Sequence, residues 1–390
     1  MKNIVVEMLK DLSQYPKTMY EWNTLRRPGM GVDYTSEEYR ALVKRVVNSL
    51  HPARMRLRVT LIIDETPSAK TFRLVRVDGD TPPFRAGQYI NLFVNQQGVH
   101  TSRPYSISSP PGVEYLDLTV RDVPGGFVAP FLLEAFRVGD SFDSTGPAGS
   151  FYHEPLIDGE DLVFVAGGSG ITPFMSIIRQ MELQGWPRKI TLLYGSRRTN
   201  DVIFGEELAR LAKKNERFRF ASIISEPPKN YRGLKGFIDA KLIRKEVGAI
   251  AGKTFYLCGP HAMYDFCIPE LLKLGVPRHK IKRELYGPPA DITKVPGWPA
   301  KLKPTTVFTV QVNDQTIQAP AGEPLLNSLE RHGLVVPAVC RSGECSACRT
   351  RLLSGEVFMP PNAGLRESDR QFGYIHACVA FPISDLVIRL

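Results

Sequence analysis

The chain has 390 residues, of which 43% are hydrophobic and 23% charged, and its formal net charge is +10 at pH 7. This length predicts two or three domains with sizeable cores, and the composition is ordinary for a soluble globular protein. Residues 306–390 hold 7 Lys and Arg against 8 Asp and Glu, which leaves +11 on the remainder. The sequence has no run of like charge and no aromatic–basic motif. We therefore expect no nucleic acid partner, and we interpret the basic body as a solvated surface that suits an acidic protein partner.

No apolar run approaches the roughly 18 residues needed to cross a bilayer, so no transmembrane segment is expected. The first 17 residues carry acids within their apolar part and no small-residue cleavage site. This argues against a signal peptide and favours a cytoplasmic location. In a reducing compartment, the six cysteines are expected to be metal ligands or active-site thiols rather than disulfides.

Residues 1–53 are predicted to form a helical N-terminal extension. Thr35 to Glu38 has the T-x-x-E form of a capping box, and apolar residues recur on one helical face as far as Leu50. We expect this helix to pack on the next domain. The alternative is a helix that docks on a membrane surface or a partner.

Residues 54–152 are predicted to form an antiparallel β-barrel, because short β-rich runs such as YINLFV and YLDLTV alternate with turns that contain Pro and Gly. In residues 153–286, apolar strand runs such as DLVFVAGG and KITLLYGS alternate with helical patterns. That alternation predicts an α/β domain with a parallel sheet and helices on both faces. Residues 287–305 contain five prolines and predict a semi-rigid linker. Residues 306–390 begin with a predicted hairpin and a short helix.

Four cysteines distinguish this last segment. Cys340, Cys345 and Cys348 fall in one loop, and Cys378 follows with 29 residues between it and Cys348. A structural zinc site usually has two close pairs of Cys or His, whereas this C-x4-C-x2-C…C spacing resembles that of plant-type ferredoxins. The resemblance covers residues 306–390 and implies an α+β (β-grasp) domain that binds a [2Fe–2S] cluster through the four thiolates. The residues between the cysteines include small ones that let backbone N–H groups approach the sulfides: Ser342, Gly343, Ser346 and Ala347.

The stretch RPYSISS, from Arg103 to Ser109, lies at the end of a predicted barrel strand. It resembles the R-x-Y-S signature of the ferredoxin–NADP reductase family. The resemblance implies that Arg103 binds a flavin phosphate, that Tyr105 packs on the isoalloxazine and that the Ser106 hydroxyl lies near flavin N5, with Pro104 between them. A fork of N–H donors suits phosphate, and a small hydroxyl suits the redox atom.

The second flavin element of the family is a Gly followed by Ser or Thr at a helix start, where backbone N–H groups meet pyrophosphate. Gly125 and Gly126 match this element, but Ala129 and Pro130 stand where hydroxyl residues are expected. We expect FAD because the body resembles the FAD-using members, and FMN remains the alternative.

Two further stretches resemble the nucleotide site of the same family. VAGGSGITP has a strand, a Gly-rich turn and a helix start, although an ordinary strand-to-helix turn has the same pattern. YLCGP matches the family's second nucleotide element, and the resemblance implies that Cys258 lies near the nicotinamide C4. The sixth cysteine, Cys267, lies in an apolar helix and is expected in the core. The candidate residues in these two stretches are Gly168, Gly170, Thr172, Cys258, Gly259 and Pro260.

Arg197 and Arg198 follow the second predicted strand of the α/β domain. Arginine at this position favours a 2′-phosphate and hence NADPH, but NADH-using relatives also have basic residues there, so the sequence leaves the coenzyme open. Glu284, near the last predicted strand, either completes the nicotinamide pocket or is a surface carboxylate.

From residue 54 onward, the chain resembles the fused flavin–ferredoxin reductase components of oxygenases. The resemblance implies hydride transfer from NADH or NADPH to flavin, with single electrons then passing through the cluster to a protein acceptor, expected to be an oxygenase. One alternative is the same relay feeding another flavoenzyme or metalloenzyme. The other is a redox-sensing iron–sulfur protein without turnover.

Overall fold

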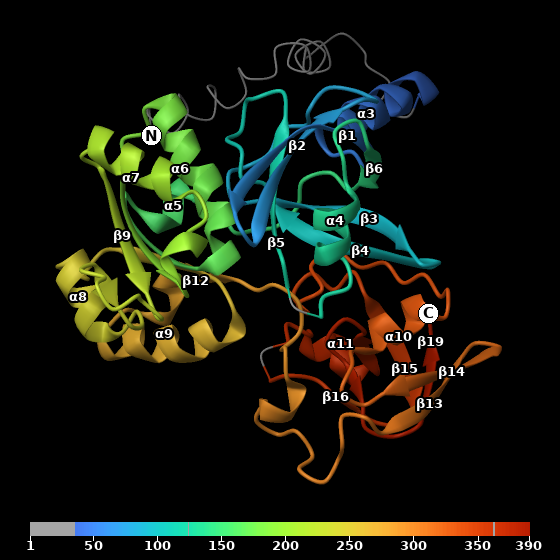
Figure 1. Cartoon of the computed structure of the whole chain (residues 1–390). Helices are drawn as coiled ribbons and strands as arrows, with labels where there is room; N and C mark the ends of the chain where they lie inside the picture. The colour runs from blue at the N-terminus through green and yellow to red at the C-terminus, as the bar shows by residue number, and fades with distance from the viewer. Residues whose placement is uncertain (1–35, 124, 362) are drawn as a thin grey trace.

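Three large sheets form three lobes in the computed structural model, which describes residues 36–123, 125–361 and 363–390 (Figure 1). We call them the barrel lobe (β1–β6), the parallel-sheet lobe (β7–β12) and the C-terminal lobe (β13–β19). Within the described ranges, no helix is long and apolar enough to span a membrane.

Helix α3 (Glu37–Leu50) precedes the barrel lobe, beside which it lies in Figure 1. Its N-cap is Ser36, whose side chain accepts a hydrogen bond from the Tyr39 amide at 3.2 Å. The cap is therefore one residue later than the T-x-x-E pattern from Thr35 suggests. Val46 is the buried residue of this helix. The predicted helical segment before Ser36 lies outside the described residues.

The barrel lobe is a curled antiparallel sheet with strand order β4-β3-β6-β1-β2-β5. An isolated bridge joins Ile107, just after β4, to Leu118 of β5, so the two sheet edges meet at one end. In β1, buried Met55, Leu57 and Val59 alternate with exposed residues, as the two-residue period of a half-buried strand requires. The antiparallel flavin-domain architecture predicted from the sequence is confirmed. The strands are β1 (Met55–Thr66), β2 (Ala69–Arg76), β3 (Tyr89–Gln96), β4 (Val99–Ser106), β5 (Leu116–Arg121) and β6 (Ser141–Ser144), and helix α4 (Ala129–Ala135) lies between β5 and β6.

The parallel-sheet lobe has strand order β10-β9-β8-β7-β11-β12, and all its pairings are parallel. Side chains of α6 and α7 share a core on one face of the sheet, and those of α8 and α9 share a core on the other, so the predicted α/β layers are confirmed. The strands are β7 (Asp161–Gly167), β8 (Lys189–Ser196), β9 (Phe218–Ile224), β10 (Leu234–Lys235), β11 (Thr254–Cys258) and β12 (Ile281–Glu284). The helices are α5 (Pro155–Asp158), α6 (Thr172–Gln184), α7 (Gly205–Lys214), α8 (Ala240–Val247) and α9 (His261–Lys273).

The strand order of this sheet reverses beside β7, because β8 pairs with one edge of β7 and β11 with the other. Ligands of open α/β sheets bind in the crevice at the carboxyl ends of strands that flank such a reversal. This topology directs attention to the residues that follow β7 and β11.

The C-terminal lobe has a mixed sheet of order β14-β13-β19-β15-β17, against which α10 packs Leu325, Leu326 and Leu329. The segment before it is not loose, because the Trp298 ring meets those of Phe358 and Phe381 at centroid distances of 5.4 and 6.3 Å. The elements are β13 (Val307–Val312), β14 (Gln315–Pro320), α10 (Leu325–Arg331), β15 (Arg349–Ser354), β16 (Val357–Phe358), α11 (Glu367–Gln371), β17 (Tyr374–His376), β18 (Phe381–Pro382) and β19 (Leu386–Arg389).

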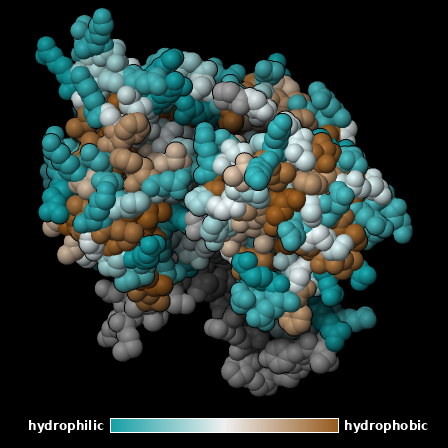
Figure 2. Space-filling view, turned by 90° about the horizontal axis from the view of Figure 1, so that it is seen from below, coloured by the Kyte–Doolittle hydropathy of each residue, from teal (hydrophilic) through white to brown (hydrophobic). Residues whose placement is uncertain are grey.

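Polar contacts hold the lobes against one another. Between the barrel and parallel-sheet lobes, the Ser176 hydroxyl donates to the Ser109 carbonyl at 2.6 Å, and Arg179 Nη1 donates to the Ser108 carbonyl at 2.9 Å. The C-terminal lobe lies beneath the barrel lobe, with α10 next to β4 (Figure 1). Seen from below, hydrophilic and hydrophobic residues are interspersed on the face in view (Figure 2).

Candidate active site

The R-P-Y-S stretch forms the end of β4, the first strand in the order of its sheet. An edge strand tolerates Pro104, which has no N–H to donate to a neighbour. Tyr105 is partly buried and packs against the barrel core. The Ser106 hydroxyl is hydrogen-bonded to the hydroxyl of Tyr286, which follows β12 in the parallel-sheet lobe. The end of β4 is thus in contact with the edge of the second sheet.

Arg103 is a mostly buried cation whose hydrogen bonds within the described part of the chain go to neutral acceptors. Its Nη1 donates to the Thr101 hydroxyl at 2.5 Å and to the Ser102 carbonyl at 2.8 Å. Burial lowers the pKa of Arg103 to about 10, and the like charge of Arg341 is the second cause. The side chain stays charged at neutral pH. A buried guanidinium with neutral partners fits an anionic group such as a flavin phosphate.

The Gly-rich turn after β7 packs directly on the loop after β11. A Cβ on Gly170 would lie 2.1 Å from the Cys258 carbonyl oxygen, so a larger residue is excluded there. Gly168 has φ of +54°, and a Cβ on it would lie 2.5 Å from Arg121 Nη1. Thr172 begins α6 and donates its hydroxyl hydrogen to the Ser169 carbonyl at 3.0 Å. The predicted strand, tight turn and helix start are present, at the reversal point of the sheet.

Cys258 ends β11, pairs with Ala166 of β7 and is fully buried. Burial, followed by the nearby Glu284 carboxylate, raises the pKa of its thiol, so the thiol is neutral at physiological pH. Hydrogen bonding to Tyr286 and Tyr264 lowers that pKa in part. Ser106 and Cys258 therefore both contact Tyr286. The loop continues with the Gly259 amide, which donates to the Tyr264 hydroxyl at 2.9 Å, and with Pro260, the N-cap of α9.

Glu284 ends β12 and pairs with Cys258. Burial raises the pKa of its carboxyl to about 8, and the next causes are the negative charges of Glu344 and Cys340 in the cysteine loop. Glu284 is therefore no free surface carboxylate. Three lobes meet here, because Ser106 and Glu284 end strands of two different sheets and Cys340 lies in a loop of the C-terminal lobe, and these residues lie around one region.

The cysteine loop and Cys378, which follows β17, bring four thiols together. Hydrogen bonding from Cys345, then from Cys378, lowers the pKa of the Cys340 thiol, and hydrogen bonding from Cys378 lowers that of Cys348. Cys345 is exposed, whereas the other three are buried. Three backbone amides, those of Ser342, Glu344 and Cys345, each donate to Cys340 Sγ at 3.4 Å.

Four thiols with amides directed at sulfur fit a [2Fe–2S] cluster. Left-handed φ values at Arg341 (54°), Gly343 (81°) and Ser346 (58°) curl the loop around these sulfurs. The His376 ring contacts the loop at the Gly343 carbonyl (2.8 Å) and the Ser346 hydroxyl (3.1 Å).

Arg197 and Arg198 do not join this region. They lie at the end of β8 with well-exposed side chains, and their Nε atoms lie 2.6 Å and 3.9 Å from the Glu226 carboxylate. Sequence reasoning missed Glu226, because nothing in the spacing pairs it with the arginines.

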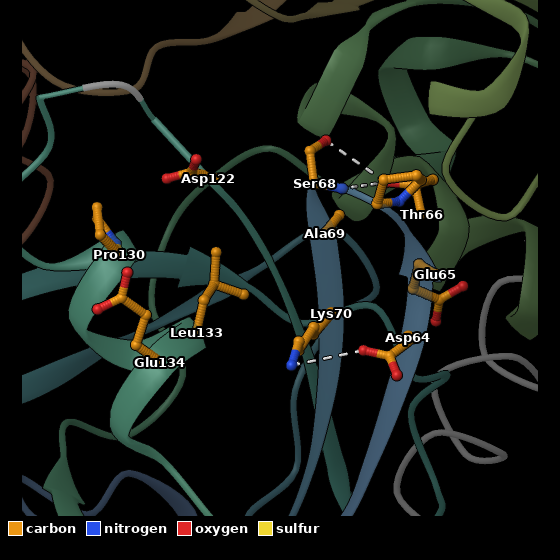
Figure 3. Close-up of a pocket in the computed structure, with 11 residues that line it drawn as sticks. Asp64, Glu65, Thr66, Ser68, Ala69, Lys70, Asp122, Pro130, Leu133 and Glu134 are labelled. Carbon is orange, nitrogen blue, oxygen red and sulfur yellow. Dashed lines mark hydrogen bonds and ion pairs between the residues drawn. The ribbon is translucent and has the colours of Figure 1, made fainter.

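Gly125 and Gly126 precede α4. Gly125 has φ of +72°, and the Gly126 amide donates to the Val123 carbonyl at 2.7 Å. The N-cap Val128 offers no side-chain hydrogen bond, in keeping with the departure from the family pattern. Beside this segment, a cavity of about 420 Å³ opens between the β1–β2 hairpin and α4 (Figure 3).

Carboxylates surround this cavity, and Lys70 forms an ion pair with Asp64 at 3.5 Å (Figure 3). No residue predicted to bind a cofactor lines it, and we assign it no role. The charged lining residues are Asp64, Glu65, Lys70, Asp122 and Glu134.

Tyr286, Arg341 and Glu330 were also missed by sequence reasoning. Tyr286 stands two residues after Glu284, and this closeness to a candidate residue was the only sequence signal that could have pointed to it. Arg341 lies inside the cysteine motif, but its contacts with the barrel lobe join residues 240 positions apart. Such contacts leave no periodic trace in the sequence.

Comparisons with known proteins agree with this architecture. Residues 58–153 match the oxidoreductase FAD-binding domain, residues 164–268 the oxidoreductase NAD-binding domain and residues 308–382 the 2Fe-2S iron-sulfur cluster binding domain. The chain is 31% identical to the NADH oxidoreductase HCR of Escherichia coli, over 85% of this chain and 97% of the relative. It is 29% identical to the ferredoxin reductase component of 3-ketosteroid-9-alpha-monooxygenase from Mycobacterium tuberculosis, over 85% and 94%.

Among solved structures, phthalate dioxygenase reductase shares the fold, with a TM-score of 0.63 at 23% identity over 86% of this chain and 98% of that one. The matched domains support FAD, NAD(P)H and a [2Fe–2S] cluster as the redox groups of an oxidoreductase. The chain therefore belongs to the ferredoxin–NADP reductase family, as a flavin reductase fused to a C-terminal plant-type [2Fe–2S] ferredoxin domain.

Proposed function

We propose that this reductase is the electron-donating component of an oxygenase. The relative from M. tuberculosis is named as such a component, and the match to this chain covers 94% of that relative. The observation that carries the proposal is the convergence of three lobes: Ser106 and Cys258 both contact Tyr286, while Glu284 faces the cluster ligand Cys340. Electron carriers exchange electrons efficiently only at short range, so this meeting point suits a relay.

When bound, a flavin accepts hydride and releases electrons singly, and a [2Fe–2S] cluster carries one electron at a time. The proposed task of the chain is placement. Arg103 holds the flavin phosphate, Tyr105 packs on the ring, and Ser106 lies near its redox atom. Buried Tyr286 and Cys258 exclude water from the place where nicotinamide approaches.

The remaining assignments concern the nucleotide, the flavin pyrophosphate and the cluster. The Gly-rich turn and the loop after β11 bind the nucleotide through backbone N–H groups at helix starts. The proposed nucleotide residues are Gly168, Gly170, Thr172, Gly259 and Pro260, with Gly125 and Gly126 toward the flavin pyrophosphate and Cys340, Cys345, Cys348 and Cys378 as cluster ligands.

The decisive experiment is anaerobic reduction by NADH or NADPH, followed by mixing with a purified candidate oxygenase. We expect both the visible flavin bands and the cluster bands to bleach, and substrate oxygenation to require both proteins. If the reduced protein transfers no electrons to such an oxygenase while reducing another enzyme at comparable rates, the oxygenase assignment fails.

The second candidate is the same relay with an acceptor that is not an oxygenase. It is favoured by the E. coli relative, at 31% identity, whose name mentions no oxygenase. The same mixing experiment with a flavoenzyme or another metalloenzyme separates the two candidates. A redox sensor without turnover has no need of a hydride-donor site, and it is not favoured.

A further inference from the structure

We propose that Arg341 of the C-terminal lobe completes the flavin-phosphate site of the barrel lobe, so that flavin binding and docking of the ferredoxin domain stabilise each other. This inference rests on the proposed role of Arg103. It adds a binding residue from a second domain, next in sequence to the cluster ligand Cys340.

The two arginines share one hydroxyl group. Arg103 Nη1 donates to Thr101 Oγ1 at 2.5 Å, and Arg341 Nη2 donates to the same oxygen at 2.9 Å. The Thr101 hydroxyl in turn donates to Glu330 Oε2 at 2.8 Å, and Arg341 is ion-paired with Glu330. A hydroxyl has one donor and two acceptor positions, so Thr101 is fully used. The two guanidinium groups are therefore held close together.

This cluster of side chains carries a surplus positive charge. Arg341 and Glu330 are 5% and 8% exposed and Thr101 is 6% exposed, so water screens the charges poorly. Two cations face one carboxylate, and burying an unbalanced charge is costly unless an anion compensates it. A bound anion would balance this buried charge.

Unused donors are available for that anion. The Nε of Arg341 is buried and has no hydrogen-bond partner among the described residues, while its Nη1 reaches Asn327 Oδ1 at 3.3 Å. Arg103 uses only Nη1 in its bonds to described residues. A buried donor without a partner is destabilising, and a phosphate oxygen satisfies it. The flavin phosphate that Arg103 is proposed to hold is the anion of matching chemistry.

The docking of the C-terminal lobe does not depend on these charges alone. Asn91 Nδ2 donates to the Ala338 carbonyl at 2.8 Å, and the Ser102 hydroxyl donates to the same carbonyl at 3.4 Å. A change at Arg341 therefore leaves contacts that keep the lobes together. Because Arg341 contributes to both sites, linkage requires that flavin favours docking as much as docking favours flavin.

The first test is the flavin dissociation constant of full-length, cluster-loaded protein with Arg341→Gln, measured by flavin fluorescence. We expect affinity to weaken about tenfold or more, since a charge-assisted bond to phosphate is lost. Arg341→Lys keeps the charge and should give an intermediate affinity. The matched control is Arg349→Gln, which also adjoins a cluster cysteine, Cys348, but pairs with Asp369 at 2.8 Å and should leave flavin affinity unchanged.

The second test uses the sign of the charge. Glu330→Gln removes the carboxylate that faces Arg103 and Arg341, so the flavin phosphate should bind at least as tightly as in the parent protein. A purely structural docking contact would instead weaken flavin binding as Arg341→Gln does. Flavin should also slow proteolysis of the linker in the parent protein, and less so in Arg341→Gln.

The inference is overturned if Arg341→Gln keeps both its iron and the parental flavin affinity, or if Arg349→Gln weakens flavin binding equally. Should Arg341→Gln lose its iron, Arg341→Lys and Glu330→Gln decide by the same criteria. Arg103→Ala separates the two levels of argument. If it weakens flavin binding while Arg341→Gln does not, only the shared site fails; if neither does, the phosphate role of Arg103 fails as well.

Discussion

At the residue scale, Glu284 takes its properties from two lobes, the parallel-sheet lobe and the C-terminal lobe. It ends β12, pairs with Cys258 and faces the charges of Glu344 and Cys340. Burial, more than these charges, raises its carboxyl pKa from 4.5 to about 8. The side chain is therefore largely protonated at neutral pH, and it can donate a hydrogen bond where an ionised carboxylate could not.

This raised pKa predicts a stability that falls with pH. Between pH 4.5 and about 8, the folded protein binds more protons at Glu284 than the unfolded chain does, so the contribution is full below pH 4.5 and is lost as pH rises through 8. Each pKa unit corresponds to about 1.4 kcal/mol. Between pH 6 and 9, we expect the melting temperature of Glu284→Gln to fall less than that of the parent protein. Calorimetry at a series of pH values measures this difference. The surface variant Glu216→Gln should follow the parent, and parallel curves for all three proteins would contradict the shift.

Other single residues fall into two groups: those that a local sequence motif predicts, and those whose contacts form only when the lobes dock. Ser106 and Cys258 could be proposed from the sequence because each sits at the end of a strand within a contiguous motif, and local patterns survive in sequence. The pairing of Arg341 with Thr101 joins two lobes across 240 positions. It depends on how the domains dock, which no local spacing records.

At the element scale, strands were predictable where burial is complete. Strands β7 and β11 are covered by helices on both faces of the sheet. Their sequences are therefore continuous apolar runs, which are recognisable as buried strands. The two-residue strands β10 and β16 have no comparable pattern, because their pairing depends on tertiary partners. The helix cap at Ser36 was missed by one residue, since neighbouring Thr and Ser offer alternative caps.

The end of β8 predicts coenzyme preference. Arg197 and Arg198 lie near the Glu226 carboxylate, which neutralises charge that a 2′-phosphate would otherwise meet. The three side chains are well exposed, so each pairing contributes little. We expect Glu226→Gln to raise kcat/KM for NADPH by roughly three- to tenfold, since about 1.4 kcal/mol corresponds to tenfold.

Initial rates with both coenzymes measure this effect, and kcat/KM for NADH should change less. Glu216→Gln serves again as the control, because it is an exposed carboxylate on the same lobe. An unchanged NADPH-to-NADH ratio in Glu226→Gln would place the 2′-phosphate away from this arginine pair.

At the scale of the whole molecule, the arrangement of the three lobes predicts a direction for electron flow. The proposed nicotinamide and flavin elements meet at Tyr286 in the interior, while of the four cysteines proposed as cluster ligands only Cys345 is exposed. By composition, residues 306–390 carry a formal charge of −1, whereas the rest of the chain carries +11. A protein acceptor is therefore expected to take its electrons at the cysteine loop rather than at the buried flavin region.

Cys345→Ser tests that direction by removing a proposed cluster ligand. Cytochrome c, a large one-electron acceptor, should lose at least tenfold of its reduction rate, equivalent to about 1.4 kcal/mol of barrier. Ferricyanide is small enough to approach the flavin edge, and its reduction should stay within a few-fold. Flavin must be in excess in both assays, because the altered loop also carries Arg341.

The control for this variant is Cys267→Ser, in the parallel-sheet core, where the thiol donates to the Ile238 carbonyl and a hydroxyl can replace it. It should retain both activities. If Cys345→Ser lost both activities with flavin still bound, the cysteine loop would be a structural support of the hydride-accepting site. If it kept cytochrome c reduction, electrons would leave from the flavin directly, and the meeting of three lobes around Glu284 would need another explanation.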